Sequence, residues 1–272
     1  QSNWPSFMGP TRDGVWHEKN TIDRFGKGGP KIAWRRKIGA GYGGAAVVDG
    51  RLYVMERTKD KAKGQKVENA IRRAGVIPGG ERVLCLDVKT GKPIWSHPYD
   101  CPYKIAYPTG PRTTPTVDGD RVYALSRVGD LVCANVTKGK ILWRVNFQRD
   151  FGGRMMSGWG YSESPLVDGN RLIITPGSKT AAMAALNKMN GNVIWKAAMP
   201  PNTGNRGRDG AGYSSIVISN AARTKQYVQL TGRGVISVGA RSGKLLWGYN
   251  RVANGTANIP TPIVKGDHVF LE

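Results

Sequence analysis

VLCLDVKTGKPIW, from Val83 to Trp95, decides the fold, because variants of this phrase return three times further along the chain. The later copies run from Cys133 to Trp143, from Ala185 to Trp195 and from Ser237 to Trp247. Their glycines are Gly91, Gly139, Gly191 and Gly243, with spacings of 48, 52 and 52 residues. A period of this length is typical of propeller blades rather than of short solenoid repeats.

A second phrase precedes each copy of the first and occurs a fifth time after the last copy, where the chain end cuts it short. It reads AAVVDGRLYV from Ala45, TPTVDGDRVYAL from Thr114, SPLVDGNRLIIT from Ser164, SSIVISNAARTKQYVQL from Ser214 and TPIVKGDHVFLE from Thr261. Asp-Gly pairs between alternating apolar residues indicate hairpins, because type I′ turns need positive φ at both central residues. Each unit therefore predicts a four-stranded antiparallel meander, which must pack against copies of itself to bury both faces.

We therefore predict an all-β protein, a β-propeller with four full blades at residues 45–100, 114–148, 164–199 and 214–250. A fifth, split blade is expected from residues 260–272 together with the strand 30–38, a closure that removes open sheet edges. Residues 1–29 are expected to pack on the propeller as an extension, and residues 57–80 to form a basic insertion. In a chain of this length a second copy could instead complete the split blade, giving a swapped homodimer.

The charge is strongly positive, with 41 Lys and Arg against 19 Asp and Glu and a formal net charge of +22. This favours an anionic partner, although a solvated surface without a partner would give the same count. No RNA-recognition signature or zinc finger occurs, so nucleic acid is not expected as a ligand. The cations expected to meet a partner protein or an anionic polysaccharide lie in the insertion: Lys59, Lys61, Lys63, Lys66, Arg72 and Arg73. A solvated loop without a partner is the alternative there.

The segments before the first strand of each blade are expected to converge on one mouth of the central channel. They combine glycine with hydroxyl, aromatic and charged residues, a mixture suited to binding a sugar, a cofactor or a peptide. The alternative is that these loops only pack the corners between blades. The candidate ligand-binding residues are Tyr42, Arg112, Arg154, Trp159, Tyr161, Glu163, Asp209, Tyr213 and Asn258.

The cysteines indicate packing rather than chemistry. Cys85, Cys101 and Cys133 have no CxxC spacing, and at least one thiol must be free. Cys85 and Cys133 hold the position of Ala185 and Ser237 in the other copies, so a small buried residue is expected there. The three histidines are scattered, and no metal site is expected.

The repeated phrase also carries a family likeness. A small residue is followed two positions later by Asp or Asn, six later by Gly and ten later by Trp, as in Cys85, Asp87, Gly91 and Trp95. This pattern resembles the tryptophan-docking repeat of pyrroloquinoline-quinone-like (PQQ-like) propellers. Residues 3–16 resemble exported quinoprotein-like repeat proteins of planctomycete-type bacteria, which in turn resemble the BamB-type outer-membrane assembly lipoproteins. The likeness implies a ring of seven or eight blades, with docking tryptophans at Trp34, Trp95, Trp143, Trp195 and Trp247. It therefore favours the alternative to closure by a split blade, in which further blades of the natural protein are missing from this chain.

This likeness and the charge together predict an exported, non-catalytic scaffold that binds a partner protein or an anionic envelope polysaccharide. The start QSNWPSF is compatible with a periplasmic or extracellular protein whose signal peptide has been removed, and no stretch is apolar enough for a membrane span. The alternative is a PQQ-dependent alcohol or sugar dehydrogenase. The residues that could bind the quinone and its calcium are then Trp159, Arg112, Arg154 and Glu163. The resemblance implies adjacent cysteines in alcohol-oxidising enzymes, and none occur here, so no cofactor is expected.

Overall fold

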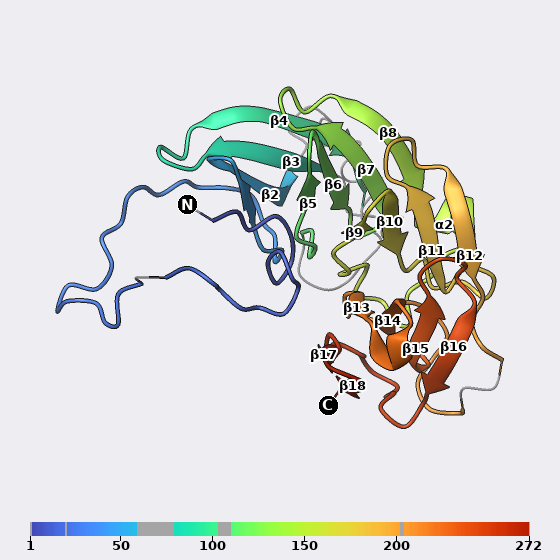
Figure 1. Cartoon of the computed structure of the whole chain (residues 1–272). Helices are drawn as coiled ribbons and strands as arrows, with labels where there is room; N and C mark the ends of the chain where they lie inside the picture. The colour runs from blue at the N-terminus through green and yellow to red at the C-terminus, as the bar shows by residue number, and fades with distance from the viewer. Residues whose placement is uncertain (1, 20, 59–78, 103–109, 202–203, 272) are drawn as a thin grey trace.

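The computed structural model describes residues 2–19, 21–58, 79–102, 110–201 and 204–271. Within these ranges the strands form four four-stranded antiparallel sheets and one two-stranded sheet. The four large sheets follow one another around an open arc (Figure 1). The prediction of an all-β propeller with four-stranded blades is confirmed.

Each blade is a meander in which consecutive strands pair. The first blade holds β1 (Ala46–Val48), β2 (Arg51–Thr58), β3 (Gly80–Asp87) and β4 (Pro93–Asp100). The second holds β5 (Thr116–Asp118), β6 (Arg121–Leu125), β7 (Asp130–Asn135) and β8 (Ile141–Asn146), followed by the short helix α2 (Phe147–Phe151). The third holds β9 (Leu166–Asp168), β10 (Arg171–Ile174), β11 (Met183–Asn187) and β12 (Val193–Ala197). The fourth holds β13 (Val217–Ser219), the 3-10 turn η1 (Ala221–Arg223), β14 (Gln226–Thr231), β15 (Gly234–Gly239) and β16 (Leu245–Tyr249).

Tryptophans of the outer strands, together with Trp34 of the N-terminal segment, dock on a neighbouring blade, and we call these contacts the outer clasp. Trp95 Nε1 donates to Val136 O of the next blade at 2.7 Å, and a Cβ on Gly139 would lie 2.4 Å from the Trp95 ring. Gly139 has a φ of +68°, so both the space and the backbone require glycine. The same arrangement joins Trp34 to Val88 and Gly91, Trp143 to Lys188 and Gly191, and Trp195 to Ala240 and Gly243. Trp247 differs, because its Nε1 donates to Gln226 Oε1 of its own blade at 2.8 Å.

Hydroxyl groups before the first strands form a second connection, the inner clasp. Each hydroxyl accepts a hydrogen bond from a backbone N–H of the preceding blade. Thr114 accepts from Gly44 at 3.1 Å, Ser164 from Thr114 at 2.9 Å, Ser215 from Ser164 at 3.0 Å, and Thr261 from Ser215 at 3.2 Å. The second repeated phrase therefore supplies a link between blades as well as a hairpin.

Apolar residues of facing sheets fill the space between the blades. Between the first two blades, Tyr53 and Cys85 pack against Val122 and Val132. All three cysteines are free and buried, and burial raises the pKa of the Cys85 thiol to about 11. These thiols are therefore protonated packing groups at neutral pH.

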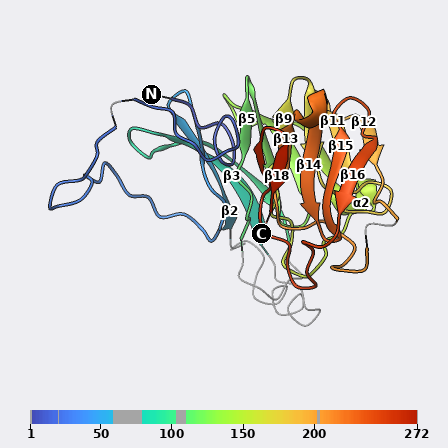
Figure 2. The same ribbon diagram turned by 60° about the horizontal axis from the view of Figure 1, so that its bottom comes forward.

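The N-terminal segment lies across the first strands of three blades. Trp4 forms an antiparallel bridge with Val47, and Val117 N donates to Pro5 O at 2.8 Å. Arg12 is buried, and its guanidinium donates to Ser164 O at 2.6 Å. Both views show this segment beside β2 and β5 (Figures 1 and 2). No helix among the described residues is long and apolar enough to cross a membrane.

The two ends of the arc do not join. Residues 30–38 contain no strand, and β17 (Ile263–Lys265) pairs only with β18 (His268–Phe270). The split blade expected from residues 30–38 and 260–272 is therefore not formed in this structure. The reason is geometric, because four blades leave an open arc whose ends stay apart (Figure 1).

Candidate functional site

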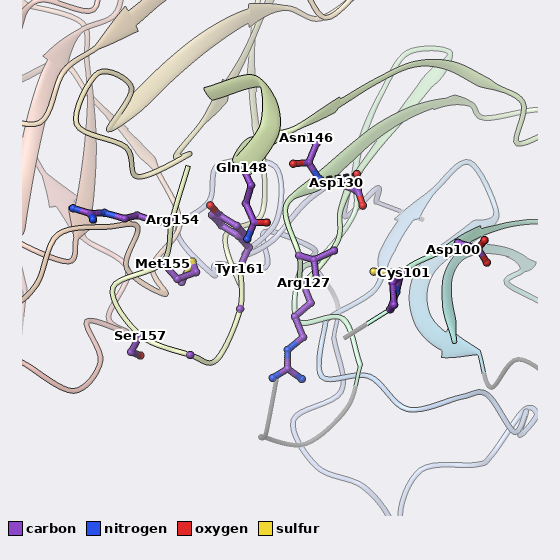
Figure 3. Close-up of a pocket in the computed structure, with 14 residues that line it drawn as sticks. Asp100, Cys101, Arg127, Asp130, Asn146, Gln148, Arg154, Met155, Ser157 and Tyr161 are labelled. Carbon is purple, nitrogen blue, oxygen red and sulfur yellow. Dashed lines mark hydrogen bonds between the residues drawn. The ribbon is translucent and has the colours of Figure 1, made fainter. Parts of the chain in front are cut away.

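A groove of about 480 Å³ opens where the end of β4, the β6–β7 turn, helix α2 and residues 154–161 meet (Figure 3). Its lining combines charged, amide, hydroxyl and apolar groups. The lining residues with labels in Figure 3 are Asp100, Cys101, Arg127, Asp130, Asn146, Gln148, Arg154, Met155, Ser157 and Tyr161. Of the residues expected at the channel mouth, Arg154 and Tyr161 line this groove directly.

Helix α2 fixes one wall of the groove. Its N-cap is Asn146, whose Oδ1 accepts from Arg149 N at 2.9 Å, and it ends at Gly152 in the left-handed conformation. The Asn146 side chain also donates to Asp130 Oδ1 at 2.9 Å, and Asp130 forms an ion pair with Arg144 at 2.9 Å. These bonds tie the helix to β7 and β8 beneath it.

A shared carboxylate organises the charges beside the groove. Asp209 accepts from Arg154 Nη2 at 2.8 Å and from Arg233 Nε at 2.7 Å. The hydrogen bond from Arg233 is the main cause that holds the pKa of Asp209 below its usual range. The carboxylate is therefore ionised at neutral pH, and the trio keeps one net positive charge. Arg154 is about half exposed, so this charge faces solvent.

An aromatic pair lies next to these charges. Trp159 and Tyr213 have ring centroids 5.4 Å apart, and the Tyr213 hydroxyl hydrogen-bonds the Ser157 hydroxyl. A parallel bridge between Met155 and Ala211 brings the two mouth segments together. The Tyr213 ring is buried whereas Trp159 remains partly exposed. Trp159 therefore presents an aromatic ring to solvent while Tyr213 packs against it.

Four of the expected ligand-binding residues are buried and form contacts within the fold, namely Tyr161, Glu163, Tyr213 and Asn258. Tyr161 donates to Pro176 O at 3.0 Å, and Asn258 Nδ2 donates to Thr231 O at 2.8 Å. Glu163 is only 2% exposed. These residues therefore help to pack the corners between blades, and their part in binding a ligand stays a prediction.

Glu163 belongs to a buried polar network between the third and fourth blades. Its Oε1 accepts from Thr175 N at 2.9 Å, and its Oε2 accepts from Gln229 Nε2 at 3.2 Å. Burial raises the pKa of Glu163 to about 8, although the nearby Arg12 guanidinium acts in the opposite direction. The carboxyl group therefore carries a proton at neutral pH.

Tyr42 and Arg112 pair with each other on the side of the first two blades. The Arg112 guanidinium carbon lies 5.0 Å above the centre of the Tyr42 ring, which is exposed. The six cations of the insertion, Lys59, Lys61, Lys63, Lys66, Arg72 and Arg73, lie outside the described residues.

Most of the residues considered for a quinone and calcium make contacts within the fold. Arg112 stacks on an aromatic ring, Arg154 pairs with Asp209, and Glu163 is buried with both oxygens bonded. Calcium prefers ionised, accessible oxygen ligands, and a buried protonated carboxyl is neither. No group of three or more His, Cys, Asp or Glu in the described part of the chain is placed to hold a metal ion. We therefore derive no quinone chemistry from these residues.

Sequence reasoning missed several residues of the groove. Arg233 completes the charged trio, and the groove is also lined by Asp130, Asn146, Gln148 and Ser157. None of these residues was among the candidate ligand-binding residues. Asn146 carried a readable signal, because an Asn before FQRDFGG is a typical N-cap followed by a glycine stop. The remaining residues come together only through the folded arrangement.

The fold and its docked tryptophans define a β-propeller of PQQ-like repeats. Residues 79–271 match the family model described as "Outer membrane protein assembly factor BamB", and the chain belongs to this family. The predicted resemblance is thus confirmed. No curated protein matches the chain.

Solved structures with the same fold include two dehydrogenases. The quinohemoprotein alcohol dehydrogenase from Comamonas testosteroni is 16% identical with a TM-score of 0.61, covering 96% of this chain and 43% of that one. A europium-containing methanol dehydrogenase is 14% identical with a TM-score of 0.52, covering 81% and 44%. BamB from Moraxella catarrhalis is 13% identical with a TM-score of 0.36, covering 65% and 61%. At such identities the likeness to the two dehydrogenases shows the fold alone, and this chain spans less than half the length of either one.

Proposed function

We propose that this chain serves as an exported, non-catalytic scaffold that binds a partner protein or an anionic envelope polysaccharide. The observation that carries this proposal is that the buried titratable groups at the channel mouth bond within the fold, whereas the accessible groups lie at an open groove. The buried titratable groups Tyr161 and Glu163 form internal hydrogen bonds. Arg154 is about half exposed and lines an open groove, and the partly exposed Trp159 lies near it, which suits recognition better than chemistry.

The charge beside the groove supports an anionic ligand. Arg154 and Arg233 share the single carboxylate of Asp209. A bound anion could therefore contact Arg154 while Asp209 keeps its ion pair with Arg233. The whole chain carries a net charge of +22, which would steer anionic partners toward it. Trp159 adds an aromatic face of the kind that anchors peptides and sugars.

The family supports an envelope location and a protein partner. Its description, outer membrane protein assembly factor, names an assembly role in the envelope for the family. The dehydrogenase alternative has less support from the site, because Glu163, considered for the calcium, is buried with both oxygens hydrogen-bonded.

Two defined polyanions test the proposal, heparin for a polysaccharide and poly-L-glutamate for an acidic protein segment. Binding of each to the full chain is measured by titration calorimetry across a range of salt concentrations. We expect Arg154→Gln and Trp159→Ala to weaken binding and Asp209→Asn to strengthen it, because that change removes the competing carboxylate. The matched control is Arg121→Gln, since Arg121 is also paired with an aspartate but lies at the start of β6 in the second blade, outside the groove lining.

The pattern across the variants decides the result. Opposite changes at Arg154 and Asp209, with an unchanged Arg121 variant, support the groove as the binding site. Equal binding by all variants for both probes would refute it. A response to only one probe distinguishes the polysaccharide from the acidic protein.

A further inference from the structure

The end of the turn between the third and fourth strands of each blade, together with the first residues of the fourth strand, has a repeated surface composition. The three residues between its glycine and the docked tryptophan are Lys-Pro-Ile, Lys-Ile-Leu, Asn-Val-Ile and Lys-Leu-Leu in the four blades. We call residues 92–94, 140–142, 192–194 and 244–246 the outer-turn belt. The belt places an aliphatic residue directly before every tryptophan of the four full blades.

These aliphatic side chains remain in contact with solvent. Ile94 is 43% exposed, and Leu142, Ile194 and Leu246 are each 42% exposed. The near-identical values show that the exposure belongs to the repeat rather than to an irregular site. The belt follows the outside of the arc, where β4, β8, β12 and β16 run (Figure 1).

Exposed cations accompany the aliphatic residues. Lys92, Lys140 and Lys244 open three of the four belt segments, and Lys89, Lys138 and Arg241 precede the same glycines, all exposed. Asp87 is the acidic residue of the first turn and accepts from Thr90 at 2.8 Å. The turns of the second and fourth blades keep both positive charges. The third turn is weaker, because it has Asn192 and its Lys188 pairs with Asp118 at 2.5 Å.

The pairing of cations with aliphatic groups favours one class of partner. A polysaccharide would be held by cations and aromatic rings, but the repeated apolar residues here are aliphatic. A folded protein would usually meet one irregular patch, whereas the belt offers the same short motif from blade to blade. An anionic bilayer is laterally uniform, attracts basic residues and accepts aliphatic side chains at its interface.

We propose that the outer-turn belt is a docking surface for the headgroup region of an anionic phospholipid bilayer. Lysine ammonium groups would contact lipid phosphates while neighbouring Ile and Leu side chains enter the interface. The surface is separate from the channel-mouth groove, so the propeller could hold its partner while resting on a membrane. The inference stands independently of the ligand proposed for the groove.

Sedimentation with large vesicles tests this inference. The full chain is mixed with vesicles of phosphatidylcholine containing phosphatidylglycerol, and with vesicles of phosphatidylcholine alone. We expect binding to the anionic vesicles only, and a partition coefficient lower by about a hundredfold in the Lys92→Gln, Lys140→Gln, Lys244→Gln triple variant. These lysines are exposed, so the triple variant is expected to fold, which thermal unfolding verifies.

A second variant and a control separate the contributions. The Leu142→Ser, Leu246→Ser variant should lose the part of the binding that survives at raised salt, because that part comes from apolar insertion. The control carries Lys19→Gln, Arg24→Gln and Lys27→Gln, an equal charge change at exposed positions outside the belt. It should bind nearly as the unmodified chain does.

Three results would overturn the inference. One is an unchanged partition coefficient in the lysine variant, and another is an equal loss in the control, which would show a general charge effect. The third is loss of retention on heparin by the lysine variant while vesicle binding stays the same, which would assign the belt to a polysaccharide. The groove variants at Arg154 and Asp209 should not alter vesicle binding, so failure of either proposal is recognised separately.

Discussion

The inner and outer clasps join the same blades by different physical means. The outer clasp fits a large ring against a glycine that no other residue could replace, since a Cβ on Gly139 would meet the Trp95 ring at 2.4 Å. The inner clasp needs only an oxygen atom at a fixed place, and Thr114, Ser164 and Ser215 all supply one. A steric requirement restricts the sequence more than a single hydrogen bond does. The outer clasp therefore leaves a pattern that is easily recognised in the sequence, whereas the inner clasp leaves almost none.

The largest effect is expected from breaking the outer clasp. Trp95→Ala should lower the free energy of unfolding by about 3–5 kcal/mol, because it leaves a cavity between two blades and removes the bond to Val136. Trp247→Ala should cost clearly less, since Trp247 is more exposed and bonds within its own blade. Denaturant unfolding of both variants measures the difference. Equal losses would show that docking on the next blade adds nothing.

The outer clasp explains why so much of the fold follows from the sequence. Glycines at a constant offset from tryptophan mark each turn, and the Asp-Gly pairs mark each hairpin, so β5 to β8 occupy Thr116 to Asn146 where the repeat places a blade at 114–148. The arrangement of residues 30–38 could not be predicted from the sequence in the same way. Trp34 docks on the first blade as the repeat implies. Residues 30–38 form no strand, because the strand edge expected to pair with them belongs to the β17–β18 hairpin at the other end of the arc.

The candidate site could be predicted only in part. All nine mouth residues lie in loops of similar composition, and nothing local distinguishes Glu163, which is buried, from Arg154, which is exposed. Their difference depends on how adjacent blades pack. Arg233 and Asp130 were missed for a related reason, because their partners Asp209 and Asn146 are distant in the sequence.

A pH-dependent effect is expected next to the inner clasp, at Glu163, which precedes Ser164. Its pKa rises from 4.5 in the unfolded chain to about 8 in the folded one, mainly through burial. Between these values the folded state binds more protons, so stability should fall as the pH rises from about 4.5 to about 8, by a few kcal/mol. Glu163→Gln should remove this slope in denaturant unfolding followed across the pH range. An unchanged slope would assign the pH dependence to other groups.

A smaller loss is expected from removing one hydroxyl of the inner clasp. Ser215→Ala leaves the buried Ser164 N–H without its acceptor, which should lower the free energy of unfolding by about 1–3 kcal/mol. The matched control is Ser162→Ala, because the Ser162 hydroxyl bonds only to Gly160 O within its own loop. Chemical denaturation compares the two variants. A loss at Ser162 as large as that at Ser215 would contradict a special role for the hydroxyl between blades.

The smallest effect is expected where the inner clasp reaches the C-terminal hairpin. Thr261 accepts from Ser215 N at 3.2 Å and is only partly buried, so Thr261→Ala should change the free energy of unfolding by less than about 1 kcal/mol. Hydrogen exchange is the sharper measurement, because the Ser215 amide should exchange faster in this variant while the Ser164 amide stays protected. Thr261→Ser keeps the oxygen and should restore protection. Fast exchange at both amides in Thr261→Ala would mean that the clasps open together, and that the inner one is not a series of independent bonds.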